Sequence, residues 1–227
     1  MRKRSREKKH SAAIDRRMDR LDPDDIRKAI YAIDGYRQHA FYELTHIDKM
    51  VENRTLGRKF AEIWKPLRRK MVKMARVTSS IPGLVRLATI QTYTEALWQI
   101  PVPILFIMLF VGLFFPDIPF VGAIAPYVMI TTFAAILIGV GARYIIGGMI
   151  SKRINNFFEE NPEVNKAREK EVRKAVQLLI EQLRQYISHK DENPEDHLVG
   201  VGLLDYNHIE VVKEPKPWRK HYLVKLT

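Results

Sequence analysis

Hydrophobic residues in the middle of the chain form two long runs that contain no charged residue. Between Glu95 and Asp117 lie 21 uncharged residues, and between Asp117 and Arg143 lie 25 more. At about 1.5 Å per helical residue, each run is long enough to cross the roughly 30 Å hydrocarbon core of a bilayer. Both runs are apolar on every face, whereas a helix of a soluble core is apolar on one side. The pattern predicts a transmembrane helical hairpin with spans at 98–116 and 120–143.

Small and amphipathic side chains mark the expected contacts of this hairpin. Ala135 and Gly139 form a small-xxx-small pair, which allows close packing either within the hairpin or between two protomers. Trp98 and Tyr144 lie near the expected interfaces, where aromatic rings with a polar edge settle. Arg143 is about one turn from the predicted end of the second span, so its side chain is expected to extend to the interface. We interpret Trp98, Arg143 and Tyr144 as interface anchors.

Positive charge lies on the outer flanks of the hairpin and is strongest before it. The formal net charge is +12, and residues 1–100 alone hold 23 Lys and Arg against 12 Asp and Glu. The turn between the spans has no basic residue. The positive-inside rule then places both termini in the cytoplasm of a multi-pass protein of the cell membrane.

From residue 22 onward, apolar residues recur at the spacing of an α-helix. Asp22 and Pro23 form a helix-start signal, and apolar residues then follow one stripe as far as Val51. This predicts one amphipathic helix of about 28 residues. His39, Glu43 and His46 share a face of that helix and are metal-ligating residue types. They lie away from the apolar stripe, so a solvated polar face is the favoured interpretation, and no metal site is assigned.

The segment from Leu56 to Val77 has the most distinctive soluble pattern. Leu56, Phe60 and five further apolar residues occupy about 100° of a helical wheel, with basic residues opposite. A basic polar face opposite Trp, Phe and Leu is typical of a helix lying in the headgroup plane, although a soluble helix packed on its neighbours gives the same pattern. The residues predicted to bind the lipid surface are Arg58, Trp64, Lys65, Arg68, Arg69, Lys73 and Arg76.

The part of the chain after the hairpin has two patterns. Heptad-like apolar spacing from Val172 to Ile187 predicts a helix that belongs either to a coiled coil or to a small bundle. Residues 198–204, 207–212 and 221–226 then read as short strands, with a turn at 205–207 joining the first two.

These patterns predict a mainly α membrane protein with a small C-terminal β unit. We divide it into a basic tail at 1–21, amphipathic cytoplasmic helices at 22–99, the hairpin at 98–143, a helical arm at 144–190 and the β unit at 191–227.

No catalytic, cofactor-binding or metal motif is found in the sequence, and the chain has no cysteine. We therefore expect a non-catalytic protein without a cofactor: a membrane-anchored scaffold or accessory subunit that contacts anionic lipid and joins a homo-oligomer or larger membrane complex. The alternatives are a small oligomeric pore or transporter subunit, and a membrane tether for nucleic acid or ribosomes through the basic runs at 2–9 and 54–76.

Overall fold

A computed structural model of the chain describes residues 20–115, 119–216 and 219–227. The described residues belong to two units. The helix–sheet unit combines the segment up to Val77 with the segment from Pro162 onward, and the hairpin unit covers Thr78–Asn161. The predicted basic tail, apart from its last two residues, and the predicted turn at 116–118 lie outside the described residues.

The first helix starts where the sequence predicts it but ends much earlier. Helix α2 spans Pro23–Gly35, and the Asp22 carboxylate accepts hydrogen bonds from the backbone N–H groups of Asp24 and Asp25. A 3-10 turn, η1 (Tyr36–Gln38), follows, and His39 then adopts a left-handed conformation with φ of 59°. The chain becomes helical again only in α3, Thr45–Glu52. The prediction of one helix from residue 22 to 51 is therefore wrong, because the chain turns at the end of η1.

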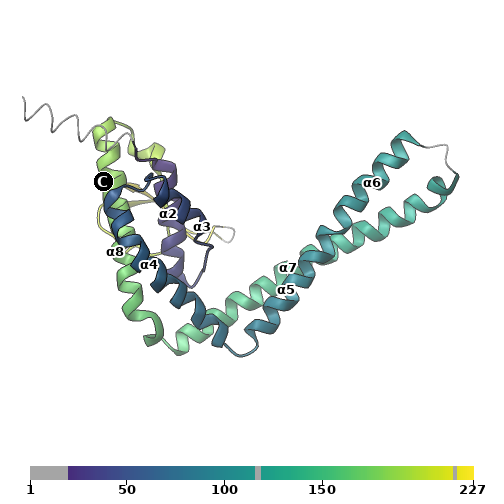
Figure 1. Ribbon diagram of the computed structural model, residues 1–227, viewed down its shortest axis with the longest axis horizontal. Helices are drawn as coiled ribbons and strands as arrows, with labels where there is room; N and C mark the ends of the chain where they lie inside the picture. The colour runs from purple at the N-terminus through teal and green to yellow at the C-terminus, as the bar shows by residue number, and fades with distance from the viewer. Residues whose placement is uncertain (1–19, 116–118, 217–218) are drawn as a thin grey trace, which may run out of the picture. The chain divides into compact units, whose positions relative to one another are not determined.

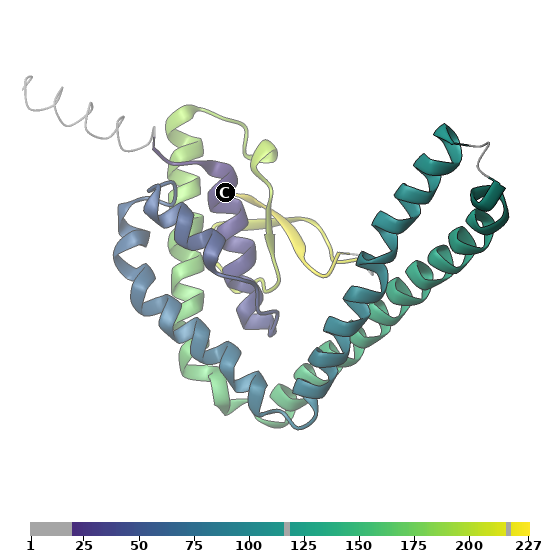
Figure 2. The same ribbon diagram turned by 45° about the vertical axis from the view of Figure 1, so that its right-hand side comes forward.

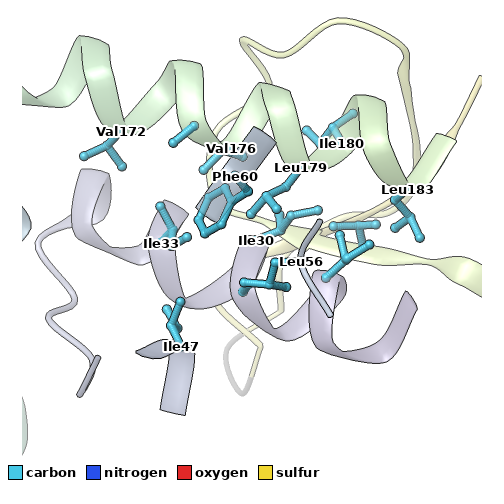
Figure 3. Packing of buried hydrophobic residues seen from close by; sticks show 14 of the residues in the cluster. Ile30, Ile33, Ile47, Leu56, Phe60, Val172, Val176, Leu179, Ile180 and Leu183 are labelled. Carbon is cyan, nitrogen blue, oxygen red and sulfur yellow. The ribbon is translucent and has the colours of Figure 1, made fainter. Parts of the chain in front are cut away.

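Helices α4 (Arg58–Val77) and α8 (Glu163–Lys190) form the framework of the helix–sheet unit. Pro66 lies inside α4 without interrupting it. The apolar sides of α4 and α8 pack together and against α2, around a core that includes Ile30, Phe60 and Leu179 (Figure 3). Each of these three side chains is fully buried.

The apolar stripe of α8 faces its own chain. Val172, Val176, Leu179 and Leu183 are all completely buried in the shared core. The stripe is therefore not available as the seam of a coiled coil with a second copy, and the small-bundle alternative is the one that the structure adopts. Segments from both sides of the hairpin thus build one hydrophobic core.

The C-terminal strands form a small antiparallel sheet. Strands β1 (Val199–Val201), β2 (Ile209–Lys213) and β3 (Tyr222–Leu226) lie close to their predicted positions, and a 3-10 turn, η3 (Pro194–His197), precedes them. The strand order is β1-β3-β2, with Val199 opposite Val224 and Ile209 opposite Leu226. The predicted pairing of the first two strands is wrong, because β3 lies between them. One side of the sheet reaches the core through Val201 and Val224, and β1 contacts α2.

The described residues of the hairpin unit form three α-helices. After the 3-10 turn η2 (Thr78–Ser80), α5 spans Leu84–Gln99, α6 spans Pro101–Phe114, and α7 spans Pro119–Glu160. Both α5 and α6 pack along α7, so that two long apolar helical stretches form a hairpin (Figures 1 and 2). The stretches long and apolar enough to cross a membrane are Leu84–Phe114 and Ala125–Glu160. They extend well beyond the predicted spans at the ends away from the hairpin turn. The first stretch starts earlier because α5 leads directly into α6, and the second ends later because α7 continues past Arg143.

Candidate membrane-facing surfaces

The outer surface of the hairpin unit consists largely of exposed apolar side chains. Phe106 is 68% exposed and Leu113 is 74% exposed. In the most apolar window of Leu84–Phe114 no residue is buried. Soluble monomers rarely expose contiguous apolar patches of more than a few hundred Å². Further exposed members of this surface are Ile104, Ile107, Leu109, Phe110, Phe114, Ile130, Phe133, Leu137 and Ile138.

One small residue of α7, Gly139, serves the contact within the hairpin. A Cβ atom added at Gly139 would lie 3.1 Å from the Trp98 Cβ and 3.2 Å from the Trp98 backbone nitrogen, so α5 and α7 approach closely at this point. Ala135, one turn earlier, is half-buried. The structure therefore uses Gly139 for packing within the hairpin. By contrast, a Cβ at Gly141 would meet nothing within 4 Å.

Two of the three predicted interface anchors, Trp98 and Arg143, lie at this close contact, and the third, Tyr144, is adjacent in sequence to Arg143. The Arg143 guanidinium forms an ion pair with Glu95 across the two helices, with 3.6 Å between Nη2 and Oε1, and lies 6.0 Å from the centre of the Trp98 ring. Tyr144, the next residue of α7, is 86% exposed. Arg143 and Trp98 are thus joined to each other and to Glu95, whereas Tyr144 points outward. Glu95 was not predicted as the partner of Arg143, although both residues border the uncharged runs.

The apolar face of α4 is occupied by the core of the helix–sheet unit. Trp64 is only 5% exposed, and its indole Nε1 donates a hydrogen bond to Asp48, at 2.8 Å. This placement corrects the expectation that Trp64 and the neighbouring apolar side chains insert into lipid. The alternative of a soluble helix packed on its neighbours is the correct one for this face, because α8 and α3 cover the apolar side chains of α4.

The basic face of α4 is exposed, with two partial exceptions. Arg68 is bound by Asp48, with Nε–Oδ distances of 2.8 and 2.9 Å, and Lys70 pairs with Glu171 of α8. Arg58 pairs with Glu62 one turn along but keeps 86% of its side chain exposed. The other predicted lipid-binding residues on this face, all exposed, are Lys65, Arg69, Lys73 and Arg76. The result is a cationic surface that does not depend on insertion of apolar side chains.

A buried polar network in the helix–sheet unit had no signal in the sequence. Arg37 donates to both Asp205 oxygens, at 2.8 and 2.7 Å, and to the Tyr206 hydroxyl at 2.6 Å. The Tyr206 hydroxyl in turn donates to Asp34, which also accepts from the Gly202 backbone N–H. The network joins η1 and α2 to the loop after β1, so its members come from segments more than 160 residues apart in the chain.

Charge and burial shift the acidities in this network in opposite directions. Burial raises the pKa of the Asp34 carboxyl above its usual value, against the opposing hydrogen bonds from Tyr206 and Gly202. The hydrogen bonds from Arg37 hold the pKa of Asp205 below its usual value. The Arg37 guanidinium is buried, and it donates hydrogen bonds to the Asp205 carboxylate and to the Tyr206 hydroxyl. Such hydrogen bonds to a carboxylate offset the cost of burying the charge. The arrangement fastens the two segments of the unit together.

The described residues contain no group of three or more His, Asp or Glu side chains arranged to hold a metal ion. The face that would have joined His39, Glu43 and His46 does not form, because the helix ends before His39.

Comparison of the chain with protein-family models, curated proteins and solved structures finds no match.

Proposed function

We propose that this chain is a non-catalytic integral membrane protein in which a two-span hairpin anchors a helix–sheet unit beside one leaflet. The observation that carries the proposal is the contrast between the two units. The helix–sheet unit buries its apolar residues, whereas the hairpin unit directs them outward along helices of membrane-spanning length. Lipid is the surrounding in which such an outer surface is stable.

The discontinuous core supports a topology in which both flanks of the hairpin lie on the same side. Helix α4 precedes the hairpin and α8 follows it, yet they pack directly against each other. Two segments that share one core cannot be separated by a bilayer, so the number of crossings between them is even. Basic residues on both flanks favour the cytoplasmic side for them.

The exposed basic face of α4 supports contact with anionic headgroups by charge. Arg58, Lys65, Arg69 and Lys73 are exposed along one helix that ends immediately before the hairpin unit. Each such cation near an anionic leaflet contributes roughly 1 kcal/mol of attraction. The same surface supports nucleic-acid binding as a second candidate function, since phosphates of either kind would complement it.

The absence of cysteine makes the topology directly testable. We suggest three single-cysteine variants of the full chain, Lys59→Cys, Phe115→Cys and Glu195→Cys, all at exposed positions. In intact cells a membrane-impermeant maleimide should label only the Phe115→Cys variant, and all three after the membrane is disrupted. The chain should also remain in the pellet after alkaline carbonate extraction. Labelling of Lys59→Cys and Glu195→Cys from opposite sides would refute the hairpin topology.

We further propose that the helix–sheet unit acts as a scaffold or accessory subunit by recruiting a partner to the membrane. Purification in mild detergent should recover a partner in fixed ratio with the full chain. Replacing the hairpin by an unrelated two-span hairpin should preserve that partner if the helix–sheet unit recruits it. Loss of the partner in this exchange would assign recruitment to the hairpin, and binding of RNA instead of anionic vesicles at about 150 mM salt would favour the nucleic-acid tether.

A further inference from the structure

A mixed polar and apolar pocket lies within the hairpin unit, where α5 begins and α7 ends. Its volume is about 480 Å³, within the range of small-molecule sites. The apolar part is lined by Ile81, Pro82, Leu87, Met149 and Phe157. The polar part is lined by Lys152, Arg153, Asn156 and Glu160, which follow one another along the last turns of α7. An occupant that matches both parts is amphiphilic.

The two cations of the pocket are available to a ligand. Lys152 and Arg153 are both exposed to solvent. The pocket's formal charge is +1, because the two cations are opposed by one carboxylate, Glu160. That charge complements one phosphodiester group, which carries a single negative charge.

The Arg153 guanidinium lies against the turn before α5. Gly83 has a left-handed backbone with φ of 73°, and a Cβ atom added there would lie 2.5 Å from the Arg153 Nη1. A residue with a side chain would displace the guanidinium from this position. Gly83 is also the N-cap of α5, and no side chain caps that helix. The positive end of α5 therefore adds to the potential that Lys152 and Arg153 create.

We propose that this pocket binds the headgroup of a monoanionic glycerophospholipid, with its phosphodiester on Lys152 and Arg153. Its acyl chains would extend over the apolar lining that continues into the exposed surface of the hairpin. Glu160 and Asn156 would accept hydrogen bonds from headgroup hydroxyls, which selects phosphatidylglycerol over a lipid with a bulky methylated headgroup. Basic pockets between membrane helices bind anionic headgroups by this chemistry. The assignment rests on the proposed membrane insertion and adds a defined lipid site to it.

The test measures phosphatidylglycerol bound to the full chain in detergent by native mass spectrometry, with phosphatidylcholine as the comparison lipid. Each lost cation should weaken binding about fivefold, so the double variant Lys152→Gln/Arg153→Gln should bind about 25-fold more weakly. Glu160→Gln should strengthen phosphatidylglycerol binding by about fivefold, because it removes the opposing charge. The matched control Lys65→Gln/Arg69→Gln removes the same charge from α4 and should leave this site's occupancy unchanged.

The outcomes separate this site from the proposed function. If every variant is retained in carbonate-washed membranes but phosphatidylglycerol and phosphatidylcholine bind equally, the lipid site is refuted and the membrane anchor stands. Equal losses in the pocket and control variants would also refute it. Inorganic phosphate at about 10 mM, a concentration at which charges are screened only beyond about 30 Å, should not displace the lipid. Displacement by phosphate alone would show a simple anion site. Release of the wild-type chain by carbonate would instead contradict the membrane anchor itself.

Discussion

The two units use the same kinds of apolar residue in opposite ways. Phe60 of α4 is fully buried between helices of the helix–sheet unit, whereas Phe106 of α6 is 68% exposed on the hairpin unit. In α4 the apolar residues follow one stripe and charges fill the other side, so the helix needs a protein partner on one face only. In α6 every turn is apolar all round. The difference teaches that a helix with a single apolar stripe is satisfied by a protein partner on one face, whereas a helix that is apolar on every face needs an apolar surrounding on all sides.

Polar groups divide between the units in the same way. The helix–sheet unit buries a network around Arg37, in which each charge has several partners. In the hairpin unit the ion pair of Glu95 and Arg143 lies at the helix contact and remains partly exposed. The following experiments test this contrast, starting with the largest expected effect.

The strongest test exchanges a phenylalanine for alanine once in each unit. Phe60→Ala should destabilise the helix–sheet unit by about 3–5 kcal/mol, because it leaves a cavity in a close-packed core. Phe106→Ala should leave the free energy of unfolding of that unit unchanged. Urea unfolding in detergent can be followed by Trp64 fluorescence, in a background with Trp98 and Trp218 replaced by Phe. Equal effects of the two variants would contradict the division into independent units.

Removal of the buried charge is the next largest effect. Arg37→Met should destabilise the helix–sheet unit by about 3–5 kcal/mol, because it removes the hydrogen-bond donor of Asp205 and Tyr206 and the ion-pair partner of Asp34. The same fluorescence measurement applies. Arg58→Met is the control, since its ion pair with Glu62 is exposed and pairs of that kind contribute little. A loss below about 1 kcal/mol for Arg37→Met would show that the network is dispensable.

The packing of the hairpin can be tested at its glycines. Gly139→Leu should weaken the contact between α5 and α7 by about 1–3 kcal/mol, because its Cβ would already lie within 3.4 Å of Trp98 and Leu97. Gly141→Leu should have little effect, because a Cβ there meets nothing within 4 Å. Cross-linking of cysteines introduced into α5 and α7 reports the contact. If Gly141→Leu alone reduced cross-linking, α7 would present a different face to α5.

The smallest effect concerns acid stability of the helix–sheet unit. Burial, with the nearby Arg219 charge, lowers the pKa of His221 below its usual 6.5. The unfolded chain therefore binds a proton that the folded unit does not, and the stability this group contributes is complete above pH 6.5 and is lost as the pH falls toward the folded pKa. His221→Gln should flatten the decline in unfolding free energy below pH 6.5. An unchanged slope would mean that His221 is not responsible.

Local signals predicted most elements of the fold, and long-range pairing set the rest. The uncharged runs predicted the hairpin, Asp22 predicted the start of α2, and three apolar segments predicted the strands. The sequence could not show that α8 covers α4, because an amphipathic stripe specifies only that it needs a partner. Nor could it show that β3 separates β1 from β2, which depends on contacts across the whole unit.

The candidate surfaces divide along the same line. Gly139 was predicted as a packing residue and Arg143 as an interface anchor from their place in or beside an uncharged run, and in the structure both lie next to Trp98. Trp64 was misassigned because lipid and a protein core satisfy the same apolar face. The network of Asp34, Arg37 and Tyr206 escaped recognition because its members have ordinary local spacing and meet only after the chain has folded.

Because the protein is synthesised from its N-terminus, α4 is made well before α8, the helix against which it packs. The interval from 78 to 161, 84 residues by difference, separates α4 from the helix that completes its core. Closing a flexible loop of that length would oppose docking by about 4 kcal/mol on the logarithmic scaling of loop entropy. In the proposed membrane insertion, a hairpin already in the bilayer would hold its two ends close together and remove much of that opposition. We therefore expect the nascent α4 to wait, with its apolar stripe uncovered and open to chaperones, until both spans have entered the membrane and α8 has emerged from the ribosome.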